Sequence, residues 1–280
     1  MKKTTIAIAA VALALGAASA KADEDAELVI DGQEFVTKTE SPEGHPIDVI
    51  LSGWRFRTDE TQAVQTDDFD NPAFIFVDQA LDMWETVEGS AGKSCASCHG
   101  AVEESMAGVR ASMPKWNEAA GDLWSLENYV NACRTERMGA EPLKWTGSDM
   151  TAMTALIGLQ SRGMPVDVAI DGPAAEWFEK GKEMYYTRYG LLELSCANCH
   201  EDNYGNMIRA DHLSQGQING FPTYRLKNTK LNSIHARFKG CVRDTRAETF
   251  KPGSAEFRAL ELYVAWRGTG LSIETPSVRN

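Results

Sequence analysis

The stretch Ser195-Cys196-Ala197-Asn198-Cys199-His200 holds two cysteines three positions apart, followed at once by a histidine. On one helical turn, two thiols at this spacing can each add to a vinyl group of haem, and the next histidine can bind the iron. The pattern occurs a second time in Ser94-Cys95-Ala96-Ser97-Cys98-His99. The sequence therefore predicts two covalently bound haem c groups, attached through Cys95, Cys98, Cys196 and Cys199, with His99 and His200 as proximal iron ligands.

The two motifs belong to longer segments that match each other. Asp82–Gly89 and Glu183–Gly190 both read acid-Met-aromatic-x-Thr-x-x-Gly, and the offset of 101 residues continues into the two cysteine motifs. A constant offset indicates an internal duplication. Zinc is the usual alternative for C-x-x-C, but it would explain neither the histidine after each pair nor the matching segment before it.

The N-terminus has the features of a secretory signal peptide over residues 1–20. Lys2 and Lys3 precede an apolar run, and Ala18-Ser19-Ala20 is a small-residue cleavage site. A retained membrane anchor is the alternative, but the run is short for a membrane span. We therefore expect a periplasmic protein without membrane insertion. The net charge of −12 argues against nucleic acid as a partner.

The remaining chain predicts a mainly α fold, in which an N-terminal extension precedes two fused cytochrome c-type domains. The extension spans residues 21–70, where residues 48–51 are a candidate strand and disorder is equally open. The two domains are expected at residues 71–165 and 166–280, without clear strand patterns in either. The apolar spacing and capping residues predict helices at about residues 72–89, 123–133, 149–159, 173–189 and 254–268, with a turn near Cys241.

Two cysteines remain, and they occupy similar places in the two units. Cys133 follows His99 by 34 residues, and Cys241 follows His200 by 41 residues. This region of a cytochrome c usually supplies the distal iron ligand, so both cysteines are candidates for that role. A disulfide between them is the alternative for an exported protein. The competing distal ligands are Met106, Met113, Met138, Met207, His212 and His235.

A basic block surrounds Cys241. Residues 225–246 hold seven basic residues and one acidic residue, in a chain that is acidic as a whole. Such a block can attract a small anion, although a solvated basic face is the commoner explanation of a charge run. The cysteine within the block favours an anion site.

The paired motifs and the segment His-Ala-Arg-Phe-Lys-Gly-Cys at 235–241 resemble the dihaem A subunit of the SoxAX cytochromes, the L-cysteine S-thiosulfotransferases of sulfur oxidation. The resemblance covers nearly the whole chain after residue 20. It implies a heterodimer with a SoxX-like monohaem cytochrome c, which links thiosulfate oxidatively to a cysteine of a SoxYZ-like carrier protein.

The same resemblance assigns roles to individual residues. In that family the catalytic cysteine is often a persulfide, and the resemblance implies that Cys241 has this role. It also implies that Arg237 binds the substrate. It also implies that Cys133 and Cys241 are the distal ligands of the first and second haem.

Three rival functions remain at this stage. A dihaem thiosulfate dehydrogenase would couple two thiosulfates to tetrathionate. A dihaem peroxidase needs an iron with an accessible distal position, so cysteine ligation at both haems counts against it. A non-catalytic dihaem electron carrier would leave Cys241 inert and use the basic block for docking.

Overall fold

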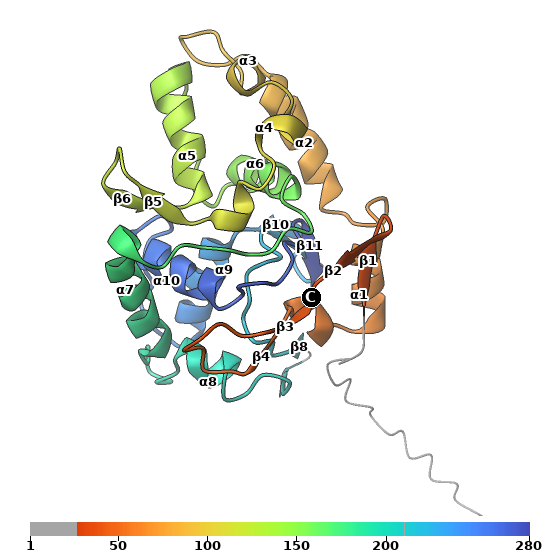
Figure 1. Cartoon of the computed structure of the whole chain (residues 1–280), viewed down its shortest axis with the longest axis vertical. Coiled ribbons are helices and arrows are strands. Elements are labelled where there is room, and N and C mark those ends of the chain that lie inside the picture. Colours follow the sequence, from red (N-terminus) through yellow and green to blue (C-terminus); the bar gives the residue numbers. More distant parts are fainter. Residues whose placement is uncertain (1–26, 210) are drawn as a thin grey trace, which may run out of the picture.

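The computed structural model describes residues 27–209 and 211–280 (Figure 1). The expected signal peptide at residues 1–20 lies outside the described residues. Within the described part, no helix combines the length and the apolar character that crossing a membrane requires.

The described residues of the expected N-terminal extension pack against the end of the chain. Its elements are β1 (Leu28–Ile30), β2 (Gln33–Phe35), β3 (Lys38–Glu40), β4 (Val49–Leu51), η1 (Gly53–Phe56) and α1 (Asp59–Thr66). The strand expected at residues 48–51 is confirmed as β4, which pairs with β3. Disorder is wrong for the described part, because fully buried Glu274 accepts hydrogen bonds from Ser52, Gln65 and Arg279.

The first helical unit is built around two packed helices. Its elements are α2 (Phe74–Glu85), α3 (Ala96–His99), α4 (Val102–Ser105), η2 (Arg110–Ser112), β5 (Lys115–Asn117), β6 (Asp122–Trp124), α5 (Leu126–Ala132), the π-helical η3 (Cys133–Met138) and α6 (Ser148–Leu159). Helix α2 packs on α6 through fully buried alanines, among them Ala80, Ala152 and Ala155. The helix expected from Leu123 begins instead at Leu126, because Leu123 lies in the β5–β6 hairpin and Ser125 caps the helix.

The second unit repeats the pair of packed helices and adds a small sheet. Its elements are η4 (Gly172–Ala174), α7 (Ala175–Tyr186), α8 (Cys196–His200), β7 (Met207–Ile208), β8 (Asp211–His212), β9 (Thr223–Arg225), β10 (Lys230–Asn232), α9 (Ile234–Asp244), α10 (Ala255–Trp266) and β11 (Ser277–Arg279). At Gly181 of α7, an added Cβ would lie 2.1 Å from the carbonyl oxygen of Ala259 in α10. Only glycine permits this close approach of the two helices.

Two expectations for the second unit were wrong. Cys241 lies in helix α9, capped by Ser233, and not in a turn. The unit also contains strands, with β9 central in a sheet of order β10-β9-β11. Each of these strands is three residues long, too short for an alternating pattern to be recognised in the sequence.

The segment before each haem motif is held in the same way in both units. Gly89 and Gly190 both have positive φ, and each lies in a turn closed by a β-bridge, Glu88↔Lys93 or Tyr189↔Leu194. An added Cβ at Gly89 would lie 2.3 Å from Met138 O, and one at Gly190 would lie 2.2 Å from Thr245 O. In Figure 1 the two motifs, α3 and α8, lie at opposite ends of the molecule.

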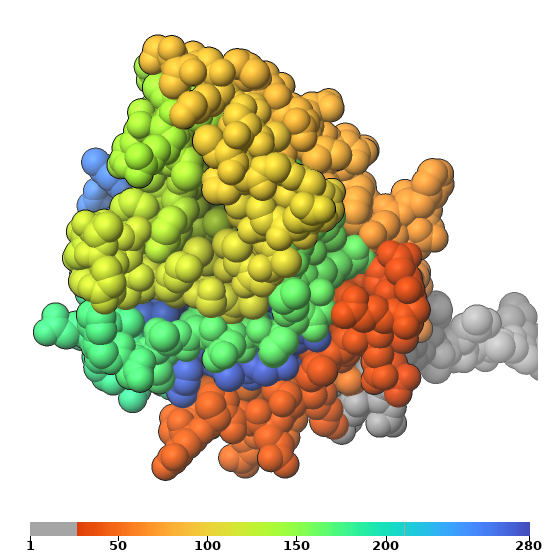
Figure 2. All heavy atoms as spheres, turned by 45° about the horizontal axis from the view of Figure 1, so that its top comes forward, coloured from red at the N-terminus to blue at the C-terminus, as the bar shows by residue number. Residues whose placement is uncertain are grey.

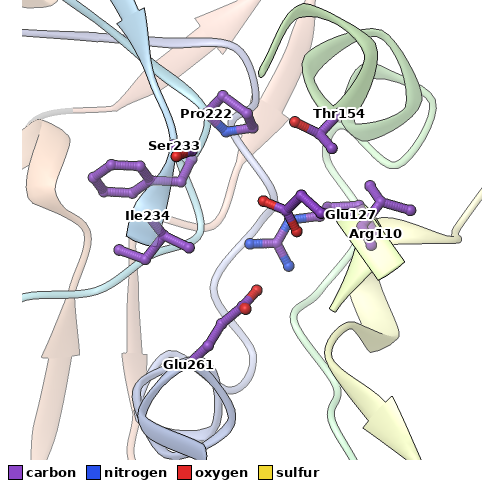
Figure 3. A pocket seen from close by; sticks show the side chains of 9 residues that line it. Arg110, Glu127, Thr154, Pro222, Ser233, Ile234 and Glu261 are labelled. Carbon is purple, nitrogen blue, oxygen red and sulfur yellow. The ribbon is translucent and has the colours of Figure 1, made fainter. Parts of the chain in front are cut away.

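A buried polar network joins the two units. Glu261 of α10 accepts a hydrogen bond from Ser125 and lies 3.1 Å from His235 Nε2. Figure 3 shows Glu261 pointing toward Arg110, with Glu127 beside that guanidinium. These side chains surround a cavity of about 20 Å³, enough for one water molecule. Burial raises the pKa of Glu127 to about 7, and the nearby Glu261 carboxylate adds to the rise.

The raised pKa makes stability depend on pH. Between pH 4.5 and about 7 the folded state holds a proton on Glu127 that the unfolded state has lost, so stability falls as the pH rises. We expect Glu127→Gln to remove this loss, which is on the order of 3 kcal/mol at pH 8. Melting of the holoprotein from pH 5 to pH 8 measures it, with exposed Glu179→Gln as the control. A wild type and a Glu127→Gln variant with parallel pH profiles would contradict this expectation.

Candidate haem and thiol sites

Each cysteine motif is a short helix with a reciprocal cap. Asn198 N donates to Ser195 Oγ at 3.2 Å, and Ser195 N donates to Asn198 Oδ1 at 3.0 Å. In the first unit, Ser94 and Ser97 exchange the equivalent two hydrogen bonds. The caps fix one helical turn, on which cysteines three apart share a face. This is the geometry that attachment to two vinyl groups requires.

His200 is oriented as an iron ligand needs to be. Its Nδ1 lies 2.7 Å from the carbonyl oxygen of Ser214 and donates to it, which leaves the lone pair of Nε2 free. Burial lowers the pKa of His200 to about 4 and keeps the imidazole neutral, the form that binds metal. Gly216 packs so closely on the ring that an added Cβ would lie 2.8 Å from Cγ.

His99 is held more loosely than His200. It is exposed, and its ring is 5.8 Å from that of Trp84, whose Nε1 donates to the carbonyl oxygen of Gly100. In the described part of the chain no protein group accepts a hydrogen bond from the His99 ring. The first motif therefore has a less fixed histidine than the second.

A third cysteine accompanies each motif. Burial raises the pKa of Cys196 to about 12, and Cys241 is the next contributor, so these two sulfurs lie close together. Burial also raises the pKa of Cys95, the charge of Arg134 lowers it, and Cys133 contributes a smaller rise, so Cys133 lies near Cys95. All six cysteines are free, so the alternative of a Cys133–Cys241 disulfide is wrong for this structure. Each unit gathers its own three thiols.

One competing distal ligand is already engaged. His235 is fully buried, its Nε2 interacts with Glu261, and its Nδ1 accepts a hydrogen bond from Gly253 N at 2.9 Å. Neither ring nitrogen is left for iron. His235 therefore has a structural role between α9 and α10.

The donor set suits haem better than a bare metal ion. Among residues 27–209 and 211–280 there is no cluster of three or more His, Cys, Asp or Glu side chains that could hold a metal ion by itself. A porphyrin supplies four nitrogens and leaves two axial positions for protein ligands. Each unit offers two attachment thiols, one imidazole and one further thiol.

In Figure 2 the surface is hollowed between the segments of α5 and α4, on the face of the first unit.

Arginines from three elements surround the second site. Arg237 of α9 is exposed and lies near Cys199 and His200, since its charge lowers the pKa of both, although burial has the larger effect on each. Arg225 of β9 lies near Arg237 and Cys241, and Arg57 lies near Arg237. From the sequence, Arg237 is the first candidate for anion binding and Lys239 and Arg243 are weaker ones, while Arg225 is one member of the basic block. Arg57 comes from the N-terminal extension, and no local pattern could have placed it here.

Comparisons with known proteins agree with this chemistry. Residues 79–166 match the family model described as SoxA/TsdA, cytochrome c domain. Two relatives carry the name L-cysteine S-thiosulfotransferase subunit SoxA. The one from Rhodovulum sulfidophilum is 56% identical over 287 residues, covering 100% of both chains, and the one from Paracoccus pantotrophus is 60% identical over 285 residues, covering 99% of this chain and 98% of the relative.

A solved structure is similar over most of the chain. It is the crystal structure of SoxXA from P. pantotrophus, with a TM-score of 0.89 and 61% sequence identity. The match covers 91% of this chain and 99% of that chain.

The contact between Gly216 and His200 gives a test of the second haem site. Gly216→Ala would push the imidazole aside, so we expect the second haem to show an altered low-spin EPR signal. Gly205→Ala is the matched control, because Gly205 has a similar φ of +82° with nothing within 4 Å of an added Cβ. The control should lose only about 1–2 kcal/mol of stability. If the two variants had equal EPR spectra, the expectation that His200 is an iron ligand would be contradicted.

Proposed function

The chain belongs to the SoxA family of L-cysteine S-thiosulfotransferase subunits, and on that basis we propose that it joins thiosulfate to a cysteine of a carrier protein. The observation that carries the proposal is that Cys241 lies near Cys196 and Cys199 and near basic residues, with Arg237 one helical turn before it on α9. In the net reaction a carrier thiol and thiosulfate give a cysteine S-thiosulfonate, one proton and two electrons.

We propose that the chain binds two haem c groups. Cys95 and Cys98 would hold the first haem, with His99 and Cys133 as axial ligands. The corresponding residues of the second haem would be Cys196, Cys199, His200 and Cys241. The gathering of three thiols in each unit supports this assignment. Haem supplies acceptors that take the two electrons one at a time.

The residues around Cys241 suit a small dianion. Arg237 is exposed and forms no ion pair with any residue among 27–209 and 211–280, so its guanidinium can bind the sulfonate end of thiosulfate. The sulfane sulfur would then face Cys241 Sγ, which receives it before the group passes to the carrier thiol. Cys241 is partly accessible, so a flexible peptide arm can reach it from solvent.

The partners and location follow from the same family membership. We propose a heterodimer with a SoxX-like monohaem cytochrome c, supported by the similarity to the crystal structure of SoxXA from P. pantotrophus. A SoxYZ-like protein would be the carrier. The signal-peptide features of residues 1–20 support a periplasmic location.

We also propose that residues 71–165 and 166–280 arose by duplication and that residues 21–70 were added in front. The paired β-bridges and the positions of Gly89 and Gly190 keep the offset of 101 residues, and each glycine packs against the backbone that follows the third cysteine of its unit, which supports a common origin.

Thiosulfate dehydrogenase is the second candidate, because the matching family model covers both SoxA and TsdA. The two reactions differ in the acceptor of the sulfur group. The heterodimer should therefore be assayed with thiosulfate and an electron acceptor, with and without a carrier thiol protein. Product that forms only with the carrier supports the transferase, and tetrathionate without it supports the dehydrogenase.

Replacement of the two extra cysteines tests the role of Cys241. We expect Cys241→Ala to lower carrier modification by at least about a hundredfold, because the sulfur that receives the group is gone. Cys133→Ala removes the matching thiol of the other unit and should lower the rate much less. Mass spectrometry of the carrier cysteine measures both. If both variants lost the same fraction of the carrier-modification rate, Cys241 would not be the reacting thiol.

Replacement of Arg237 separates substrate binding from haem structure. Arg237→Ala should raise the KM for thiosulfate about tenfold, since one charge-assisted contact to the dianion is lost. The visible and EPR spectra of the haems should stay as in the wild type. An altered spectrum with an unchanged KM would instead make Arg237 a structural residue.

A further inference from the structure

The residue after each motif histidine is linked to the helix that precedes the motif, but the two units make this link differently. In the first unit Trp84 of α2 donates from Nε1 to the carbonyl oxygen of Gly100, which follows His99, at 2.9 Å. The offset of 101 residues places Tyr185 at the position of Trp84 and Glu201 at that of Gly100. A tyrosine ring lacks the indole N–H, so the second unit requires another link.

Arg267 supplies this link. It is the C-cap residue of α10 and is fully buried, and its Nη1 donates to Glu201 Oε1 at 2.5 Å. Its Cζ lies 4.5 Å from the centre of the Tyr185 ring and 6.0 Å from that of the Tyr263 ring. Aromatic faces stabilise a guanidinium that has been removed from water. A buried ion pair thus takes the place of the neutral hydrogen bond of the first unit.

The first unit has no charged residue at either of the two positions. Gln160 is the C-cap residue of α6, as Arg267 is of α10, and it donates from Nε2 to the carbonyl oxygen of Leu156 at 3.0 Å. Gly100 has no side chain that could pair with it. The shared fold therefore forms without this ion pair, which is a feature of the second unit.

The ion pair lies against the histidine of the second site. Glu201 directly follows His200 in the chain. An added Cβ at Gly268 would lie 3.4 Å from Oε1 of Gln217, and the glycine before Gln217 packs on the imidazole. The segment that covers the imidazole is therefore next to the end of α10. Burial has the largest effect on the pKa of His200, and the charge of Arg267 adds to the lowering.

The two ends of the ion pair differ in exposure. The side chain of Glu201 is 14% exposed and also accepts a hydrogen bond from the exposed Tyr186 hydroxyl at 2.9 Å, whereas Arg267 is fully buried. Arg237, which also acts on His200, is exposed. Water screens an exposed charge more than a buried one. Inside the protein the positive end of the pair therefore has the stronger effect.

We propose that Arg267 is a positioning residue of the second haem: with Glu201 it fixes the helical turn that carries His200, and its buried charge favours the reduced iron. The inference rests on the proposed binding of haem at residues 196–200. Ferric iron takes up one electron to become ferrous and loses one positive charge, so a fixed positive charge nearby favours the reduced form. A thiolate ligand favours ferric iron, and Arg267 offsets part of that effect.

The test measures the reduction potential of each haem of this chain in the holo-heterodimer. Potentiometric titrations, followed by visible absorption and EPR, should compare wild type, Glu201→Gln, Arg267→Gln and Arg267→Lys. The first haem serves as an internal reference. Asp202→Asn is the matched control, because Asp202 is the next residue, is exposed and loses the same charge. Melting temperatures show whether each variant is folded.

We expect Glu201→Gln to leave the buried arginine without its counter-ion and to raise the potential of the second haem. The equilibrium constant for reduction should change about tenfold, which is ~59 mV for a one-electron couple. Arg267→Gln should lower the potential by a similar amount, and Arg267→Lys should stay closer to the wild type. The potential of the first haem should not change in these variants, nor that of either haem in Asp202→Asn.

Three results would overturn the inference. One is an unchanged second-haem potential in a folded Glu201→Gln variant, and another is an equal shift in Asp202→Asn. The third is a shift of the same sign in Glu201→Gln and Arg267→Gln, because a loosened histidine, and not the charge, would then explain both. Where Arg267→Gln does not fold, the comparison of Glu201→Gln with Asp202→Asn still decides.

The inference and the proposed function fail in different ways. If the potentials shift as expected but the wild type modifies no carrier thiol, the proposed function is overturned and the effect of the buried charge stands. If the wild type transfers thiosulfate to the carrier and neither Glu201→Gln nor Arg267→Gln shifts the second-haem potential, only the role of Arg267 is overturned.

Discussion

Both sites depend on a backbone contact between the segment before each haem motif and the end of the helix that carries the extra cysteine. In the first unit Ala91 N donates to Met138 O at 3.0 Å, and in the second Leu192 N donates to Thr245 O at 3.2 Å. Gly89 and Gly190 make room for these contacts, because any Cβ would overlap the opposing backbone. In each unit this contact keeps the three thiols near one another without the help of a bound cofactor.

The same backbone contact is found in both units, but the surroundings of the histidine and the thiols differ between them. In the first unit the histidine is exposed, and the extra cysteine begins a π-helical segment. In the second, the histidine is buried against Gly216 and hydrogen-bonded to Ser214, and arginines from distant segments reach the thiols. The second site therefore has a more firmly held histidine and several arginines nearby, which supports the proposed chemistry on a bound dianion. In the first site Arg134 and Arg137 lie near Cys95 and Cys133, and Arg134 is paired with Glu88.

The sequence predicted the parts that rest on local pattern. The motifs, the helices at α2, α6 and α10, and the matching positions of Cys133 and Cys241 all follow from spacing within one segment. It missed what depends on contacts between distant segments. The sequence predicts a turn where α9 lies, because polar residues separate Ile234, Phe238 and Val242, which become a buried face only when the helix packs in the folded chain. Arg57 could not be placed, since it reaches the site across more than 150 residues of chain.

Helix α9 links the site to the rest of the molecule through its opposite faces. Arg237 and Cys241 are four residues apart and share one face, which reaches the thiols of α8. His235 lies on another face, stacked on Trp145 of the first unit and bound to Glu261. The network that joins the units thereby also fixes the helix that carries the proposed catalytic cysteine. A shift at the interface would move Arg237 and Cys241 together relative to Arg225, because that arginine is anchored separately in the sheet.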